Sequence, residues 1–268
     1  GNVGFAALKG LGRGQGFLYL SFVFFVLLSS FVGKRFFFGQ FYGDFGRVTG
    51  VLCYVVLLLL FVSLAASGSG VVAKRVVLAL ALAGVVNLVY ALVQNLGWDP
   101  VDWSNPYNPI LGTFGNPNFV SAFLGIAAAV GIVYLIDSGT SWVYRLVIVG
   151  CVGLAVYLID ASTSVQGLGV IAAGLVLALY MRFVHGKKLI YRASYQVVVV
   201  AGFVFLLLGT LQRGPLKGIA YQESVTYRGD YWRAGIEMLM KHPLLGVGMD
   251  SYGDYYRASR TEAATLRR

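Results

Sequence analysis

The sequence predicts an all-α protein that crosses a membrane several times, a polytopic transmembrane helical bundle. Of its 268 residues, 58% are hydrophobic and 12% are charged, whereas a typical soluble domain has about 25% charged residues. The mean hydropathy is +0.75. The apolar residues also gather in long runs, and a helix satisfies its own backbone amides in a bilayer. These observations exclude a water-soluble globule and a disordered chain.

Seven apolar runs are long enough, or nearly so, to cross a membrane, for which a helix needs about 20 residues. None of them contains Asp, Glu, Lys or Arg, and they cover 14–32, 48–66, 76–97, 119–136, 146–159, 165–181 and 195–211. The fifth run is short unless it extends into its flanks. Residues 1–211 are therefore predicted to be the transmembrane part, and 212–268 a partly helical loop that is truncated at its C-terminal end.

Basic residues in short loops predict which side each loop occupies. The loop after the sixth run is predicted to be cytoplasmic because it holds four basic residues and no acid: Arg182, Lys187, Lys188 and Arg192. Alternation then places 98–118 and everything from 212 onward outside. The loop 33–47 disagrees, since it would lie outside while holding Lys34, Arg35 and Arg47. Either the first spans are misplaced, or these residues face an anionic ligand.

The outer tail holds nine of the 21 basic residues and six of the 11 acidic ones, so any chemistry is expected there. Residues 227–242, followed by a proline, predict a helix with Asp230 in its first turn. Arg228 and Trp232 lie four residues apart and thus near one face. Two interpretations stay open. The helix could lie on the membrane surface with its arginines on lipid phosphates, or Arg228 could grip a substrate phosphate bidentately.

Two further segments begin predicted spans. In 112–119, Asn118 is expected to cap the fourth span, while Asn116 and Asn118 could also offer amide donors to a polar headgroup. In 162–167, serine and threonine can cap the sixth span, and Gln166 lies just inside the apolar zone. A buried polar group there indicates either a binding site or a hydrogen bond between helices.

A glycine-hinged turn follows the predicted outer helix at 242–252, and its two leucines are expected to face apolar surroundings. It lacks the remaining features of a nucleotide-binding loop. We expect no metal site and no cofactor, because neither histidine has a partner at ligand spacing. Cys53 and Cys151 are predicted to be packing residues. The net charge of +10 is attributed to cytoplasmic loops and to sites for anionic lipid or phosphate, and not to nucleic acid.

Three motifs occur in one order: Gly-Thr-Phe-Gly-Asn-Pro-Asn-Phe (112–119), Ser-Thr-Ser-Val-Gln-Gly (162–167), and Tyr-Arg followed by Trp, His-Pro-Leu-Leu-Gly-Val-Gly and Tyr (227–252). Over about 87–256 the chain thereby resembles the O-antigen ligase and polymerase family. The resemblance implies a GT-C-like glycosyltransferase, multi-pass in the bacterial inner membrane and active on its periplasmic side. Such enzymes transfer a glycan from undecaprenyl pyrophosphate to lipid A core, a growing polysaccharide or a protein hydroxyl, without a metal.

The resemblance assigns Arg228 to stabilising the departing pyrophosphate. Further candidates for substrate binding are Asn116, Asn118, Gln166, Arg213, Lys217, Trp232 and Arg233. Two departures stand out. The family's essential histidine has no match here. Because the chain begins without Met and ends at Arg268 within a polar stretch, a fragment is expected, and one that is inactive because the histidine has been lost to truncation. Gln166 stands where ligases often carry Arg, which favours a polymerase, a protein O-glycosyltransferase or another branch.

Two alternatives belong to other functional classes. A transporter of a small solute or ion would show charges within its spans or spans broken by Gly and Pro. A purely structural membrane anchor would not need a mixed-charge outer loop. Neither matches the sequence as well as the transferase does.

A reporter fused between Arg182 and Arg192 is expected to behave as cytoplasmic, because this loop holds basic residues and no acid. The measurement is a paired phosphatase and fluorescent-protein fusion at this site. Activity of the phosphatase, which needs an exported location, would overturn the predicted topology.

Overall fold

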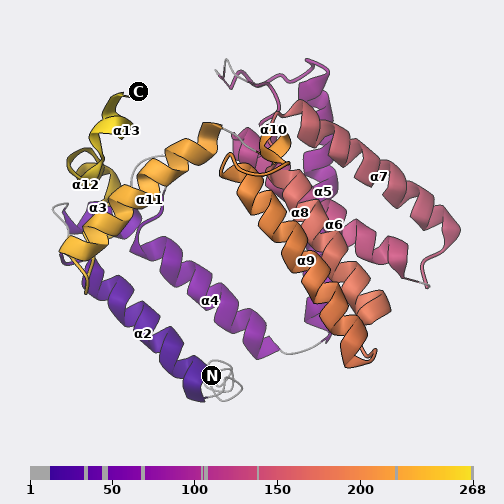
Figure 1. The fold of residues 1–268 in the computed structure, drawn as a ribbon, viewed down its shortest axis with the longest axis horizontal. Coiled ribbons are helices and arrows are strands. Elements are labelled where there is room, and N and C mark those ends of the chain that lie inside the picture. Colours follow the sequence, from indigo (N-terminus) through magenta and orange to yellow (C-terminus); the bar gives the residue numbers. More distant parts are fainter. Residues whose placement is uncertain are drawn as a thin grey trace. The chain divides into compact units, whose positions relative to one another are not determined.

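The computed structural model describes residues 13–32, 36–43, 48–67, 70–103, 105, 108–137, 139–220 and 223–266, and over these residues the protein is helical without a strand. Lys34, Arg35 and Arg47, on which a sequence-based alternative depended, lie outside them. Figure 1 shows the helices in chain order. The predicted class, a polytopic helical membrane bundle, is confirmed.

Five helices of the described residues are long and apolar enough to cross a membrane. They are α5 (Gly70–Asn95), α6 (Pro117–Ile136), α7 (Trp142–Ala161), the continuous helix Gln166–Val184 and α9 (Leu189–Thr210). The fourth consists of α8 (Gln166–Leu179) and a π-helical end, η2 (Tyr180–Val184). Two apolar helices are shorter, α2 (Arg13–Ser29) and α4 (Val51–Ser67). Between 6% and 33% of the long helices' most apolar windows is buried, so their outward faces suit lipid.

Several helices extend past the ranges expected from the apolar runs. Helix α5 begins at Gly70 instead of 76, and α7 covers Trp142–Ala161 instead of 146–159. The added turns contain Lys74, Arg75, Arg145 and Asp160. A charged side chain near a helix end can extend toward water while its backbone stays helical. That each of these helices crosses the membrane stays a prediction.

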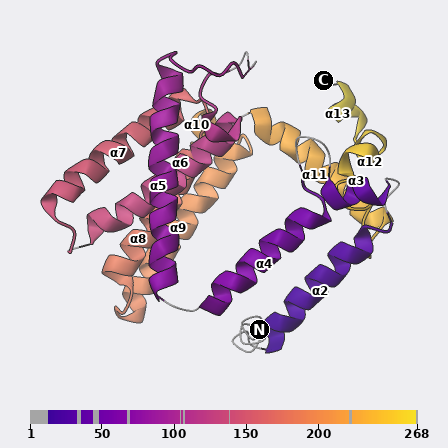
Figure 2. The same ribbon diagram turned by 180° about the vertical axis from the view of Figure 1, so that it is seen from behind.

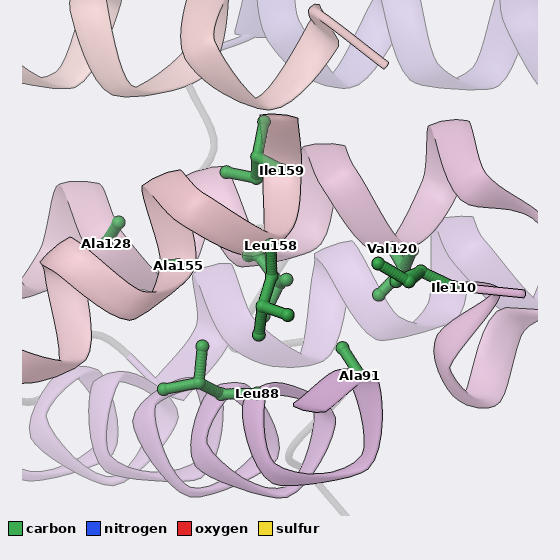
Figure 3. Close-up of a cluster of buried hydrophobic side chains, with 9 residues drawn as sticks. Leu88, Ala91, Ile110, Val120, Ala128, Ala155, Leu158 and Ile159 are labelled. Carbon is green, nitrogen blue, oxygen red and sulfur yellow. The ribbon is translucent and has the colours of Figure 1, made fainter. Parts of the chain in front are cut away.

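The chain divides into two compact units, 73–203 and the combination of 1–72 with 204–268. In the first unit, α5, α6 and α7 share a core (Figure 3). Leu88 and Ala91 come from α5, and Val120 and Ala128 from α6. Helix α7 contributes Ala155, Leu158 and Ile159, and the loop before α6 contributes Ile110. This core fixes the loop to the helices that flank it.

Small residues bring α6 and α8 close together in the same unit. A Cβ added to Gly125 of α6 would lie 2.6 Å from the carbonyl oxygen of Gly167 in α8. A Cβ added to Gly167 would lie 2.7 Å from Ile159 Cδ1 and would also strike the backbone of Ser121. Close backbone approach of this kind is how helices pack in a bilayer, where apolar side chains gain little from leaving lipid.

The second unit contains α2, α3 (Phe37–Tyr42), α4, α10 (Lys217–Ala220), α11 (Glu223–Lys241), α12 (Tyr252–Ser259) and α13 (Glu262–Leu266). Helices α2 and α4 meet through the rings of Tyr19 and Phe61, whose centroids are 5.0 Å apart. Figures 1 and 2 both show α3, α11 and α12 gathered where α2 ends and α4 begins. Ala234 and Met238 of α11 pack on Tyr256 of α12.

Changing Gly167 to Ala is expected to lower the free energy of unfolding by about 1–3 kcal/mol, because the added methyl overpacks the contact between α6 and α8. Gly169→Ala is the matched control, since no atom lies within 4 Å of its added Cβ. Both changes raise helix propensity equally, so the difference in thermal stability of the purified protein isolates the clash. Equal stability of the two variants would contradict the close approach.

Candidate functional site

Helix α11 has one buried face and one exposed face. The buried face consists of Asp230, Ala234 and Met238, spaced by four residues. Arg228 and Trp232 share one face of the helix, as predicted, and both are exposed, Trp232 by 68%. The helix begins at Glu223, four residues before its expected start at 227. Asp230 was predicted to lie in the first turn. It lies instead in the second turn, on the buried face toward α12.

The exposed face of α11 is largely apolar. Ile236, Leu239 and Met240 are exposed on it together with Trp232. An apolar groove of about 470 Å³ runs beside this face, lined by Tyr231, Trp232, Gly235, Ile236, Leu239 and Tyr252. No ion pair or hydrogen bond of the exposed Arg228 side chain is found among the described residues. The guanidinium of Arg228 thus lies at one end of an apolar surface.

Tyr252 closes the groove on the α12 side. Its hydroxyl donates a 2.6 Å hydrogen bond to the carbonyl oxygen of Tyr231. Burial, together with the neighbouring Tyr256, raises the pKa of Tyr252 above its usual value. The hydroxyl therefore stays protonated at neutral pH and remains a donor.

The turn after α11 is held by the ends of helices from the beginning of the chain. The Ser29 hydroxyl donates to the carbonyl oxygen of Leu245 at 2.8 Å, and Gln40 Oε1 accepts from the amide of Met249 at 3.1 Å. Thr49 Oγ1 donates to Asp250 Oδ1 at 2.9 Å. The connection between α2 and α4 and the segment after α9 therefore lie on the same side of any membrane that these helices cross.

The segment after α11 forms a turn, as predicted. Gly246 and Gly248 have φ angles of +64° and +100°, which glycine adopts without strain. Leu244 is 81% exposed, so it does not pack against the protein. That the two leucines face apolar surroundings stays a prediction.

In the other unit, two buried carboxamides of α5 hold the loop that leads into α6. Gln94 Oε1 accepts from the amides of Leu111 and Gly112 at 2.9 and 2.8 Å. Asn87 Oδ1 accepts from the amide and the hydroxyl of Thr113 at 3.2 and 2.9 Å. Neither carboxamide was predicted from the sequence. The available signal was the presence of amide side chains within the apolar run 76–97.

Asn116, and not Asn118, caps α6. Its Oδ1 accepts from the amide of Asn118 at 2.9 Å, and Pro117 occupies the first helical position, where proline loses no hydrogen bond. The helix thus begins two residues earlier than expected. Asn118 Oδ1 instead accepts from the hydroxyl of Ser164 at 2.9 Å, which joins the entrances of α6 and α8.

Serine and threonine of 162–167 do not cap α8, contrary to expectation. Ser162 and Thr163 donate to the carbonyl oxygens of Ile159 and Ser162. The cap comes from α6, because Ser121 Oγ accepts from the amide of Gly167 at 2.9 Å. Gln166 is the first residue of α8 and half-buried, and no hydrogen bond of its side chain is found among the described residues.

The predicted site residues fall into two sets, one in each unit. Asn116, Asn118 and Gln166 lie at the entrances of α6 and α8. The second set lies on α11 and just before it: Arg213, Lys217, Arg228, Trp232 and Arg233. All five are exposed. Within the described part of the chain, no group of three or more His, Cys, Asp or Glu side chains could hold a metal ion.

The helices define a multi-pass membrane protein with an amphipathic helical segment after its last long apolar helix. Residues 152–266 match the family model described as O-antigen ligase, a stretch that contains Gln166, α11 and the turn that follows. The resemblance to this family is therefore confirmed over 152–266, while the motif at 112–119 lies outside the match. The family's activity is that of a glycosyltransferase of the ligase or polymerase type. No curated protein and no solved structure matches the chain.

Changing Gln94 to Ala is expected to release the loop before α6, because the buried amides of Leu111 and Gly112 lose their acceptor. Leaving such a group unsatisfied costs about 1–3 kcal/mol, so amide exchange at 111–112 should accelerate by about 5- to 150-fold. Hydrogen-exchange mass spectrometry measures this. Asn95→Ala is the control, since that side chain bonds to Tyr157 of α7. Unchanged exchange in Gln94→Ala would refute the role.

Proposed function

We propose that the protein transfers a glycan from undecaprenyl pyrophosphate to a hydroxyl of lipid A core, of a growing polysaccharide or of a protein, on the periplasmic side of the bacterial inner membrane. One observation carries the proposal. Within the segment that matches the O-antigen ligase family, α11 holds an exposed Arg228 beside an apolar face. A lipid-linked pyrophosphate has the same two parts, an anion and a long apolar chain.

In the proposed reaction, the acceptor oxygen attacks the anomeric carbon of the first sugar. The bond from that carbon to the pyrophosphate oxygen breaks, and the pyrophosphate leaves with the electron pair. The guanidinium of Arg228 donates two parallel hydrogen bonds to phosphate oxygens and stabilises the departing charge. The acceptor's proton needs a base. The resemblance implies a histidine for this role, and no position in this chain matches it.

The apolar face of α11 supports a location at the membrane surface. Trp232 suits the headgroup level, where tryptophan is enriched, and Ile236 and Met240 would lie in the acyl layer. The two interpretations of this helix are then compatible, because a helix lying on the membrane keeps Arg228 at the depth of a pyrophosphate whose chain stays in the bilayer. Arg213, Lys217 and Arg233 would add positive charge near the same anion.

The hydrogen bonds of the turn after α11 support the proposed topology. Six apolar helices, α4 to α9, separate the connection after α2 from the segment that begins at Gln212. If each crosses once, both segments lie on one side, as their hydrogen bonds require. The basic loop 182–192 then lies on the opposite side. Positive charge in short loops is typical of the cytoplasmic side, so α11 would be periplasmic.

Charges in the long apolar helices argue against the transporter alternative. Lys74, Arg75, Arg145 and Arg192 lie in the first two turns of their helices, and Asp160 and Arg182 in last turns. A transport path would need ionisable groups near the middle of the membrane. The choice among acceptors rests on Gln166, which favours a polymerase, a protein O-glycosyltransferase or a related branch over a lipopolysaccharide ligase.

Changing Arg228 to Ala in the full-length protein is expected to lower the rate of glycan transfer by about 10²- to 10³-fold, because the leaving pyrophosphate loses a preorganised cation. Arg228→Lys should recover part of the rate, since lysine keeps the positive charge but cannot donate two parallel hydrogen bonds. The measurement is transfer in proteoliposomes with equal amounts of inserted protein.

Arg257→Ala is the matched control, because Arg257 is also exposed and follows α11 on the next helix. It should transfer at the wild-type rate. Wild-type activity in Arg228→Ala, or an equal loss in Arg257→Ala, would exclude a specific role for Arg228.

A further inference from the structure

The loop between α5 and α6 encloses a small polar pocket. Its volume is about 210 Å³, and its lining includes Asp99, Asp102, Trp103, Asn105 and Asn108, with Gln94 of α5 beside them. We call it the loop pocket. Three other cavities have almost wholly apolar linings: the groove beside α11, the groove between α6 and α8 and the gap among α5, α6 and α7. Those three suit lipid chains, and the loop pocket does not.

Trp103 stands in the loop pocket in a fixed orientation. Its indole Nε1 donates to Asp99 Oδ2 at 3.1 Å and to the hydroxyl of Tyr90 at 3.2 Å. Behind the ring lies Gly115, where an added Cβ would come within 3.1 Å of Trp103 Cζ3. The side chain is nevertheless 38% exposed. An aromatic surface is thus held still and left open, which reduces the entropy lost on binding.

Asp99 organises the wall on which Trp103 rests. Its carboxylate accepts from Gln94 Nε2 at 2.8 Å, from the amide of Val101 at 3.0 Å and from the hydroxyl of Tyr90 at 3.1 Å. Desolvation by itself would raise the pKa of Asp99, but these hydrogen bonds outweigh it and lower the pKa below its usual value. The carboxylate is therefore ionised at neutral pH.

The charge of the loop pocket excludes an anionic ligand. Two carboxylates, those of Asp99 and Asp102, line it, and the residues that line it in the described part of the chain include no Lys or Arg. A pyrophosphate would be repelled there. A neutral ligand rich in hydroxyls fits this lining, since hydroxyls donate to carboxylates and both donate to and accept from amides. An open indole suits the apolar face of a ring.

We propose that the loop pocket binds one sugar ring of the lipid-linked glycan. This inference rests on the proposed function and adds a second binding region to it. Four long helices, α6 to α9, separate the loop from the segment that carries α11. If each of them crosses the membrane, the loop pocket and Arg228 lie on the same side.

Hydrogen bonds connect the loop pocket to the two motifs of its unit, 112–119 and 162–167. Gln94, which lines it, holds the amides of Leu111 and Gly112, where the first motif begins. Asn108 Nδ2 donates to the carbonyl oxygen of Ala161 at 3.2 Å, directly before the second motif. A ring seated in the pocket therefore contacts elements that also fix the entrances of α6 and α8.

The test compares two ligands on the full-length protein in nanodiscs. The first is the lipid-linked glycan extracted from cells that lack the gene, and the second is undecaprenyl pyrophosphate without sugar. The wild type should bind the first more tightly. Trp103→Ala should weaken binding of the glycan by about 2- to 10-fold, as expected for an aromatic contact, and leave binding of undecaprenyl pyrophosphate unchanged. Asp102→Asn, at an exposed wall position, should act likewise.

Trp98→Ala is the matched control, because Trp98 lies on the same loop, is 72% exposed and does not line the pocket. It should change neither affinity. Equal wild-type affinity for the two ligands, or wild-type glycan binding in both pocket variants, overturns the loop pocket as a sugar site. An equal loss of affinity for both ligands in the pocket variants also overturns it, because that result would mean that these side chains are needed for folding. Failure of the wild type to bind either ligand rejects the proposed function itself.

Discussion

Backbone amides at the edge of an apolar bundle need acceptors, and two carboxamides of α5 provide them. Gln94 and Asn87 are buried in the helix that shares a core with α6 and α7. Their oxygens together accept four hydrogen bonds from residues 111–113. A loop near lipid that lacked these bonds would have to keep its amides in water. The position of the loop pocket and the start of α6 both follow from them.

The same arrangement recurs in the other unit. Ser29 ends α2, Gln40 lies in α3 and Thr49 precedes α4, and each fixes the turn after α11 through a single hydrogen bond. In both units, therefore, a segment that the sequence analysis singled out is positioned by polar side chains outside that segment. The polar side chains of these helices and connections thus fix the positions of the two segments, while the outward apolar faces suit lipid.

Composition and apolar runs were sufficient to predict the seven apolar helices, but not the short helices α3, α10, α12 and α13, because only a long apolar helix leaves an unbroken signal in the sequence. The shared face of Arg228 and Trp232 followed from helical periodicity alone. Helix ends were less predictable: α5 and α7 continue through Lys74 and Arg145, and α6 begins two residues before its expected start. Gln94, Asn87 and the loop pocket were missed, since their partners lie 5 to 26 residues away and periodicity does not report such pairs.

The three hydrogen bonds that hold the turn after α11 join residues 201 to 216 positions apart. If α2 and α4 are membrane helices, they are inserted during synthesis long before the residues after α11 leave the ribosome. The polar groups at their ends would then have to stay hydrated until the later helices have been inserted. Assembly of this unit would accordingly come late, and it would require the helices between α4 and α11 to have been inserted first.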